Sequence, residues 1–289
     1  MLIKSFIFSF LLVLSLSSTP YPVAIFHGMG DSCSNSGMQS VTQYIATSLN
    51  TYAECIEIGG GGVASITMKF SLQAEEACAS LKSNPKFQGN ISVMGLSQGA
   101  LIARYIIESC DFGGEARRYV SIGGPQMGVG VLPQCTGLLA YLCMPFNYIA
   151  RQFVYLDVVQ NNIGPAGYFR DPYDYKSYVA GATFLPDLNN EKNRTLTFIK
   201  EKYEGLEKLV LVMFEDDTMI IPKETAWFGF YDVDGETLVK MEDSDFYKQD
   251  YIGMKKLNEA GKANFVSFPG NHLQFNNSQI DNFIIPALI

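Results

Sequence analysis

Short apolar runs alternate with amphipathic stretches along most of the chain. Runs of four to six residues, each leading into glycine or acidic residues, predict buried strands over 23–26, 53–58, 91–94, 119–122, 209–214 and 264–268. Apolar residues at helical spacing predict helices over 68–81 and 98–109. Because strands alternate with helices, we expect an α/β fold whose mainly parallel sheet carries helices on both faces.

The segment 132–185 breaks this pattern. It is rich in tyrosine and phenylalanine, is interrupted by proline, and has no clear strand. We interpret it as a helical insertion over the carboxyl ends of the strands, within a single domain that spans 19–289. The glycine run 59–62 predicts a mobile loop or a close backbone approach. A nucleotide site there is a weak alternative, because the Gly-x-Gly-x-x-Gly spacing is missing.

The strand over 91–94 runs into Gly95-Leu96-Ser97-Gln98-Gly99, which matches the Gly-x-Ser-x-Gly pattern of serine hydrolases. In that pattern the glycines allow a sharp turn that exposes the serine hydroxyl above the sheet. A five-residue match also occurs in ordinary glycine-rich turns, but its place between a strand and a helix favours a nucleophile. We therefore expect an α/β-hydrolase fold with Ser97 as the catalytic serine.

A nucleophilic serine of this kind needs a histidine base and an acid. The chain has only two histidines, and the hydrolase order of serine, acid and histidine selects His272, which follows the last predicted strand. Three carboxylates, Glu215, Asp216 and Asp217, follow the strand 209–214. Any of the three could orient the histidine.

The loop after the first strand predicts half of an oxyanion hole. These enzymes take one backbone N–H from this loop and one from the residue after the nucleophile. We therefore expect the amides of Met29 and Gln98 to form the hole. His27 lies in the same loop, and we interpret it as structural, with its ring hydrogen-bonded within the loop.

The N-terminus predicts a signal peptide over residues 1–18. Lys4 precedes an apolar run over 6–16, and Ser17 and Ser18 offer small residues for cleavage. A membrane anchor is the alternative, but the run is shorter than the roughly 20 residues that span a bilayer. We expect no stable membrane span elsewhere. Three sequons then become candidates for glycosylation: Asn193 and Asn276, with Asn90 less favourable beside a strand.

Composition narrows the classes of partner. The chain is 47% hydrophobic and carries a net charge of −8, which describes a packed globular protein and argues against nucleic acid as a partner. Six cysteines in an exported chain predict disulfides. Without a Cys-x-x-Cys pair and with two histidines, we expect no metal site. The oligomeric state has no signature in the sequence.

Several segments together resemble the lysosomal palmitoyl-protein thioesterases. They are 23–33, 94–99, 121–126, 226–231 and 270–274, which include a Trp-Phe-Gly-Phe-Tyr run and a His-Leu-Gln run. The resemblance covers nearly all of the chain after the signal peptide. It departs at Cys33-Ser34, where the family has two adjacent cysteines, at Cys55, and at Asn271, which replaces an acidic residue.

The resemblance implies a function and several assignments. It implies hydrolysis of the thioester in S-acylated proteins or peptides without a cofactor, in the lysosome or outside the cell. It selects Asp217 as the acid, makes segment 132–185 an acyl groove, and pairs Cys78 with Cys110 and Cys135 with Cys143. Rival functions are a thioesterase or lipase for acyl-CoA or small esters, and a non-catalytic acyl-binding module.

Cys33 and Cys55 have no precedent in the family. Cys55 lies in the second predicted strand, which should be a parallel neighbour of the first. Neighbouring strands lie about 4.8 Å apart, which is within the range for a disulfide if the loop with Cys33 folds back along the edge. We expect a third bridge between them.

Overall fold

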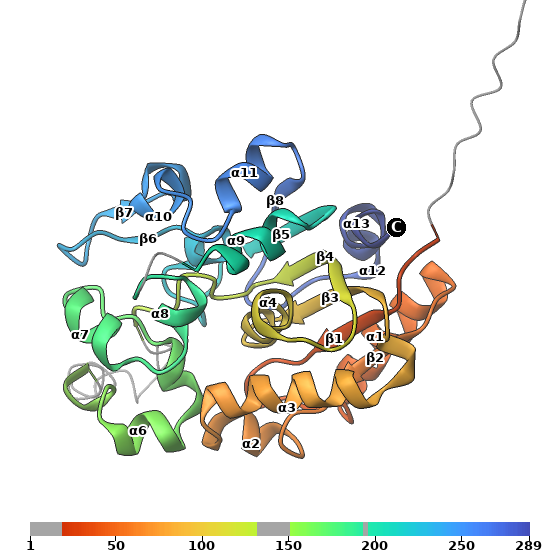
Figure 1. Cartoon of the computed structure of the whole chain (residues 1–289), viewed down its shortest axis with the longest axis horizontal. Helices are drawn as coiled ribbons and strands as arrows, with labels where there is room; N and C mark the ends of the chain where they lie inside the picture. Colours follow the sequence, from red (N-terminus) through yellow and green to blue (C-terminus); the bar gives the residue numbers. More distant parts are fainter. Residues whose placement is uncertain (1–18, 132–150, 193–195) are drawn as a thin grey trace, which may run out of the picture.

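A six-stranded sheet forms the centre of the molecule (Figure 1). This computed structural model describes residues 19–131, 151–192 and 196–289. The strand order is β2-β1-β3-β4-β5-β8, and every neighbouring pair is parallel. The strands are β1 (Val23–Phe26), β2 (Ala53–Ile56), β3 (Asn90–Leu96), β4 (Glu115–Ile122), β5 (Lys208–Phe214) and β8 (Ala263–Phe268). The predicted α/β-hydrolase class is confirmed, and all six predicted strands are present.

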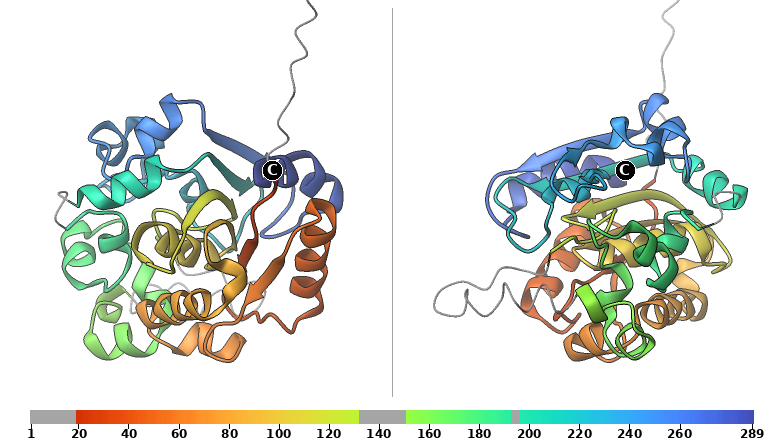
Figure 2. Two further views of the ribbon diagram at one scale, coloured as in Figure 1. Left: turned by 45° about the vertical axis from the view of Figure 1, so that its right-hand side comes forward. Right: turned by 90° about the vertical axis from the view of Figure 1, so that its left-hand side faces the viewer.

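Helices cover both faces of this sheet (Figures 1 and 2). On one face lie α3 (Phe70–Ser83), α4 (Gly99–Ser109) and α9 (Thr197–Glu204); on the other lie α1 (Ser36–Leu49) and α13 (Ile285–Leu288). Successive strand residues alternate between the two cores, as Ala24 and Phe26 do on the first face and Val23 and Ile25 on the second. This is why the strands read as continuous apolar runs.

The described part of the predicted insertion consists of short helices. These are α6 (Asp157–Asn162), the 3₁₀ helix η3 (Gly164–Tyr168), α7 (Tyr175–Gly181) and α8 (Leu185–Leu188), which lie together at the left of Figure 1. Buried side chains of this segment, such as Tyr178 and Phe184, join the same core as α3 and α4. The insertion is therefore anchored to the main domain by apolar packing.

The other elements are shorter and connect these layers. They are α2 (Gly62–Thr67), η1 (Pro85–Phe87), η4 (Lys223–Trp227), β6 (Phe230–Tyr231), β7 (Leu238–Val239), η5 (Met241–Asp243), α10 (Asp245–Lys248), α11 (Met254–Glu259), α12 (Asn277–Gln279) and the π-helix η6 (Ile280–Ile284). Strands β6 and β7 form a separate antiparallel pair.

Two of the expected disulfides are present. Cys78 and Cys110 join α3 to the end of α4, with 5.7 Å between their Cα atoms. Cys33 and Cys55 are joined as well, with Cα atoms 5.5 Å apart, because the loop after β1 folds back along β2 at the sheet edge. The predicted Cys135–Cys143 pair lies outside the described residues and stays a prediction.

Two other sequence expectations also fall outside the described residues. Residues 1–18, assigned to the signal peptide, and Asn193 are not among the described residues. Within the described part of the chain, no helix is long and apolar enough to cross a membrane.

Helix α4 carries a buried ion pair between Arg104 and Glu108. The Arg104 Nε donates to Glu108 Oε1 at 3.0 Å, and the rest of the guanidinium donates to Gln126, Leu188 and Asn189. The second carboxylate oxygen of Glu108 is buried and has no hydrogen-bond partner. Burial raises the pKa of Glu108 to about 7, although Arg104 opposes that shift.

This raised pKa predicts a pH dependence of stability. Between about pH 4.5 and 7 the folded chain binds a proton at Glu108 more tightly than the unfolded chain, so its contribution to stability falls as pH rises. Glu108→Gln removes the titration. Relative to Glu108→Gln, the free energy of unfolding of the wild type should therefore decrease from pH 5 to pH 7 in denaturant titrations. The exposed Glu201→Gln on α9 is the control, and equal slopes for all three proteins would contradict the assignment.

Candidate active site

The residues that sequence analysis singled out meet at the carboxyl edge of the sheet. Ser97 follows β3, Asp217 follows β5, and His272 follows β8, while the loop 27–30 leaves β1. Parallel strands bring their carboxyl ends to one edge, which is where open α/β sheets bind ligands. Residues that lie up to 175 positions apart in sequence therefore come into contact.

The turn that carries Ser97 is tightly constrained. Ser97 has φ of +53°, an unusual value for a residue with a side chain. A Cβ atom at Gly95 would lie 2.3 Å from the Ala100 Cα, and one at Gly99 would lie 2.3 Å from the Phe26 carbonyl oxygen. Glycine is thus required on both sides, because helix α4 starts directly against β1 and β3.

Ser97, His272 and Asp217 form a chain of hydrogen bonds. His272 Nε2 lies 2.9 Å from Ser97 Oγ, and His272 Nδ1 lies 2.7 Å from Asp217 Oδ2. Since a carboxylate only accepts, the Nδ1 carries the proton and Nε2 is free to accept from the serine hydroxyl. The other oxygen of Asp217 accepts the backbone N–H groups of Met219 and Ile220, both at 2.9 Å.

The neighbouring carboxylates face elsewhere. Glu215 accepts a hydrogen bond from Ser267, and Asp216 is exposed. Of the three carboxylates that the sequence left open, Asp217 is therefore the one in contact with His272. Its side chain is almost fully buried, at 3% exposed, which strengthens its interaction with the imidazole ring.

The two backbone amides expected to form an oxyanion hole are both unengaged. Among the described residues, neither the Met29 N–H nor the Gln98 N–H donates a hydrogen bond. Gln98 is also the residue that precedes α4, an 11-residue helix whose positive end faces this turn. Free N–H groups at such a position can receive a negative oxygen.

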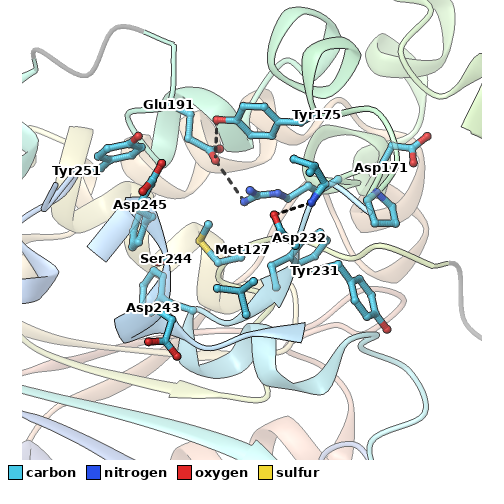
Figure 3. Close-up of a pocket in the computed structure, with 17 residues that line it drawn as sticks. Met127, Asp171, Tyr175, Glu191, Tyr231, Asp232, Asp243, Ser244, Asp245 and Tyr251 are labelled. Carbon is cyan, nitrogen blue, oxygen red and sulfur yellow. Dashed lines mark hydrogen bonds and ion pairs between the residues drawn. The ribbon is translucent and has the colours of Figure 1, made fainter. Parts of the chain in front are cut away.

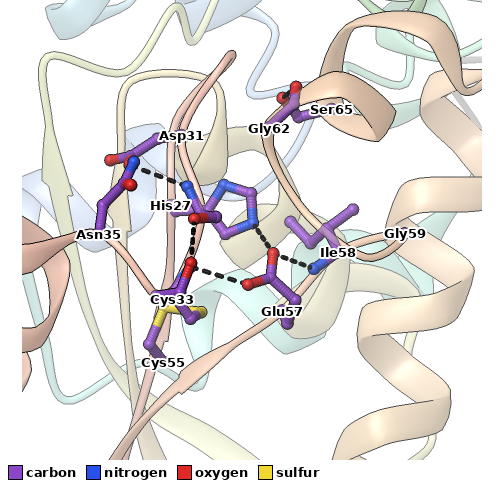
Figure 4. Close-up of polar contacts among 12 residues, drawn as sticks. His27, Asp31, Cys33, Asn35, Cys55, Glu57, Ile58, Gly59, Gly62 and Ser65 are labelled. Atoms are coloured by element: carbon purple, nitrogen blue, oxygen red, sulfur yellow. Dashed lines mark hydrogen bonds and ion pairs between the residues drawn. A yellow bond between two sulfur atoms is a disulfide. The ribbon is translucent and has the colours of Figure 1, made fainter.

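His27 is buried and belongs to the loop rather than to the hydrogen-bond chain of Ser97 (Figure 4). Its Nδ1 lies 3.0 Å from the Gly28 carbonyl, and its Nε2 lies 3.0 Å from Glu57 Oε1, at an angle outside hydrogen-bond geometry. Among the described residues, His27, Cys33 and Glu57 are the group close enough to share a metal ion. The Cys33 sulfur is held in a disulfide, so it cannot supply a thiolate ligand.

An apolar cavity of about 590 Å³ opens beside Ser97 and His272. Its volume is typical of a site for a small molecule or an acyl chain. Segment 153–169 contributes eight of its lining residues, Phe153, Val154, Val159, Ile163, Pro165, Ala166, Tyr168 and Phe169. Met29, Val129, Met219, Ile220 and Leu273 complete most of the apolar wall.

A second cavity, of about 350 Å³, has a different character (Figure 3). Five carboxylates line it: Asp171, Glu191, Asp232, Asp243 and Asp245. Glu191 pairs with Arg170 at 3.2 Å. An acyl chain would remove these charges from water without replacing their partners, so this cavity is unsuited to an apolar ligand.

Sequence analysis did not identify the network of buried polar side chains behind the site. Gln98 and Tyr168 are joined through their side chains, with the Tyr168 hydroxyl donating to Gln98 Oε1 at 2.9 Å. Gln73 and Ser65 continue this network. Lone serine and glutamine residues in predicted helices and loops have no spacing that distinguishes them from surface residues, so no sequence signal was available.

The sequence model of the family described as palmitoyl protein thioesterase matches residues 22–272. That range includes Ser97, Asp217 and His272 as well as the loop 27–30. The chain belongs to this family.

Individual relatives agree with the family. Palmitoyl-protein thioesterase 1 of Caenorhabditis elegans is 35% identical over 271 residues, which cover 91% of this chain and 90% of that protein. Palmitoyl-protein thioesterase 3 of Dictyostelium discoideum is 29% identical and covers 94% and 91%. Lysosomal thioesterase PPT2-B of Xenopus laevis is 33% identical over 63% of this chain and 62% of its own. Among solved structures, the Bacillus licheniformis lipase BlEst2 aligns over 94% of this chain and 93% of its own, with 13% identity and a TM-score of 0.49.

Asn271 gives a testable consequence of this geometry. Its Oδ1 accepts the N–H of His272 at 2.7 Å and the N–H of Thr218 at 3.0 Å. Asn271→Asp keeps an acceptor oxygen but adds a negative charge, which favours the protonated imidazolium of His272. We expect thioester hydrolysis to fall roughly threefold at pH 5 with little change at pH 8. Asn277→Asp, which adds the same charge at an exposed position on α12, is the control; identical pH profiles for both variants would contradict this reading.

Proposed function

We propose that the protein is a serine thioesterase that releases long-chain fatty acids, such as palmitate, from S-acylated cysteine in proteins or peptides. The observation that carries the proposal is the hydrogen-bonded chain of Ser97, His272 and Asp217, which opens on an apolar cavity in a member of this family. Ser97 acts as nucleophile, His272 as general base and acid, and Asp217 as the residue that orients the ring.

The first half of the proposed reaction transfers the acyl group. His272 Nε2 takes the proton of Ser97 while the serine oxygen bonds to the thioester carbonyl carbon. When the tetrahedral intermediate collapses, the carbon–sulfur bond breaks. The imidazolium then gives its proton to the departing cysteine sulfur, which leaves as a thiol.

The second half returns the enzyme to its starting state. Water gives a proton to His272 and attacks the acyl-serine carbonyl, the bond to the Ser97 oxygen breaks, and that oxygen regains its proton from the imidazolium. A free fatty acid leaves. Every proton transfer in this scheme uses His272, so the proposed reaction needs no metal or organic cofactor.

The unengaged amides support the proposed oxyanion hole. Negative charge develops on the carbonyl oxygen in both transition states, and two preoriented N–H groups stabilise it without reorganisation. The Met29 and Gln98 amides have no competing acceptor among the described residues. We assign them this role together with the positive end of α4.

The apolar cavity supports an acyl groove. Ser97 and His272 lie at its wall, so an acyl chain inside it would present the carbonyl carbon to the serine. Burial of a methylene group contributes about 0.8 kcal/mol, so a long chain gains affinity from each carbon that enters.

The signal peptide over residues 1–18 remains part of the proposal and leads to the lysosome or to secretion. Relatives named lysosomal thioesterases agree with this route. Asn276 is exposed at the start of α12 and is accessible to glycosylation, which we also propose for Asn193.

The triad assignment predicts a sharp loss of activity. Ser97→Ala and His272→Ala should each reduce kcat for a palmitoyl-cysteine peptide by about 10⁴-fold or more, and Asp217→Asn by a similar or smaller factor. Asp216→Asn is the matched control, because its side chain is exposed and does not contact His272. Circular dichroism should show that all four variants are folded.

Two results would separate the alternatives. If Asp216→Asn or Glu215→Gln were damaging and Asp217→Asn harmless, the acid is misassigned. If a fluorophosphonate probe failed to label Ser97 in the folded wild type, the result would favour a non-catalytic acyl-binding module over an enzyme.

The acyl groove predicts a dependence on chain length that one side chain can change. Val159 lines the cavity, whereas its neighbour Val158 is 66% exposed and lies outside it. Val159→Phe fills space that the chain would occupy, and the exclusion of about two methylenes costs roughly tenfold in kcat/KM for palmitoyl thioester. A butyryl thioester should lose much less, and Val158→Phe should leave both rates unchanged. Equal losses on both substrates, or a wild type that prefers acyl-CoA or short oxygen esters, would favour the rival substrate classes.

A further inference from the structure

We propose that Ser65 is a positioning residue for the oxyanion hole and that it holds the Met29 segment and the Gln98 segment at a fixed separation. The proposal rests on the function proposed above and concerns how this chain builds that site. Ser65 lies on the short helix α2, is fully buried, and does not line the apolar cavity.

The hydroxyl of Ser65 holds the loop that contains Met29. The backbone N–H of Gly30, the next residue, donates to Ser65 Oγ at 2.7 Å. The same hydroxyl donates to the Gly62 carbonyl at 2.6 Å, so its proton and one lone pair are both used. This pair of bonds ties the loop to the first turn of α2.

The carbonyl of Ser65 holds the other half of the site. Gln98 Nε2 donates to Ser65 O at 3.0 Å and to Gln73 Oε1 at 3.0 Å. Gln73 Nε2 also donates to Ser65 O, at 3.1 Å. With Tyr168 on Gln98 Oε1, the side chain of Gln98 is fixed on both sides, and so is the backbone that bears its N–H.

Backbone packing brings α2 against the same loop. A Cβ atom at Gly62 would lie 2.5 Å from the Gly30 carbonyl oxygen, so only glycine permits this approach. Gly59, Gly60 and Gly61 all have positive φ, which turns the chain into α2. The glycine run therefore serves the close approach that its sequence suggested.

Other contacts hold the two ends of the segment from His27 to Cys33 (Figure 4). At the far end, the Cys33 N–H donates to Glu57 Oε2 at 2.8 Å, and Cys33 is tied to Cys55. At the near end, His27 contacts Glu57. Ser65 contacts the loop between these points, next to the amide that would face the oxyanion.

This arrangement separates transition-state stabilisation from substrate binding. The acyl chain would be held by the apolar cavity, which Ser65 does not line. A shift of the Met29 or Gln98 amide would weaken contacts that form fully only when the carbonyl oxygen becomes negative. Loss of the Ser65 hydroxyl should therefore lower kcat and leave KM nearly unchanged.

The test compares Ser65→Ala with Thr67→Ala in the full chain. Thr67 is exposed on the same helix, and its hydroxyl also donates to a backbone carbonyl, that of Val63, at 3.0 Å. On a palmitoyl-cysteine peptide, Ser65→Ala should reduce kcat by about tenfold or more with KM within about twofold, whereas Thr67→Ala should match the wild type. A long-chain alkyl trifluoromethyl ketone, whose adduct with Ser97 carries an oxyanion, should bind Ser65→Ala more weakly by a similar factor, while inhibition by palmitate stays unchanged.

The outcomes are distinct. The positioning role is overturned if Ser65→Ala folds and keeps the wild-type kcat, or if it loses affinity equally for the ketone and for palmitate. In either case, turnover by the wild-type protein still upholds the proposed function. A wild type without turnover overturns the proposed function itself. If Ser65→Ala does not fold, Gln73→Met serves in its place: it keeps the side-chain volume but removes the bonds to Ser65 O and Gln98, so the same loss of kcat at constant KM is expected. Unchanged kcat in that variant overturns the proposal.

Discussion

The contact of the β3–α4 turn with β1 is the constraint on which the rest of the site depends. Gly99 touches the carbonyl of Phe26, the last residue of β1, and Gly95 touches the first turn of α4. This contact forces Ser97 into a left-handed conformation and points the start of α4 at the loop after β1. Ser97, the Gln98 amide and the Met29 loop are therefore placed by one backbone packing arrangement.

Close backbone packing removes polar groups from water, so their hydrogen bonds must come from the protein. A buried network of side chains supplies them. Ser65, Gln73, Gln98 and Tyr168 are each at most 4% exposed, and each makes at least one side-chain hydrogen bond within the group or to a nearby backbone carbonyl. A partly satisfied network of this kind would be costly, whereas a satisfied one fixes a single geometry. The same elements thus position the amides and stabilise the fold.

The sequence predicts the elements with strong periodicity and misses those fixed by tertiary contacts. The six apolar strands and helix α4 follow from their patterns. Helix α1 was missed because only Met38, Ile45 and Leu49 are buried in a run otherwise rich in serine, threonine and glutamine. Its stability comes from packing on β2 and α13, which no local window contains.

In the site, too, local sequence patterns predict some residues, whereas others are fixed by tertiary contacts. The Gly-x-Ser-x-Gly match singled out Ser97, and chain order singled out His272. Position after a strand left three carboxylates open, and the fold brings the side chain of one of them, Asp217, against His272. The roles of Ser65, Gln73 and Tyr168 could not be predicted, because the bonds that join them to Gln98 span 25 to 70 residues of sequence. Family resemblance identified Asp217 for a different reason, since it compares whole motifs rather than single spacings.

Glu108 and His272 favour opposite pH conditions, the first for stability and the second for the proposed reaction. Glu108 binds its proton more tightly in the folded state, so acid favours the fold in the range below its raised pKa of about 7. The proposed mechanism needs the opposite at His272, whose Nε2 must be unprotonated to accept the Ser97 proton. Asp217 limits the conflict by fixing the proton on Nδ1 but also favours the charged ring once the serine proton arrives. Stability and turnover therefore respond to pH through separate residues on α4 and after β8, so a substitution at one can shift its own pH dependence without altering the other.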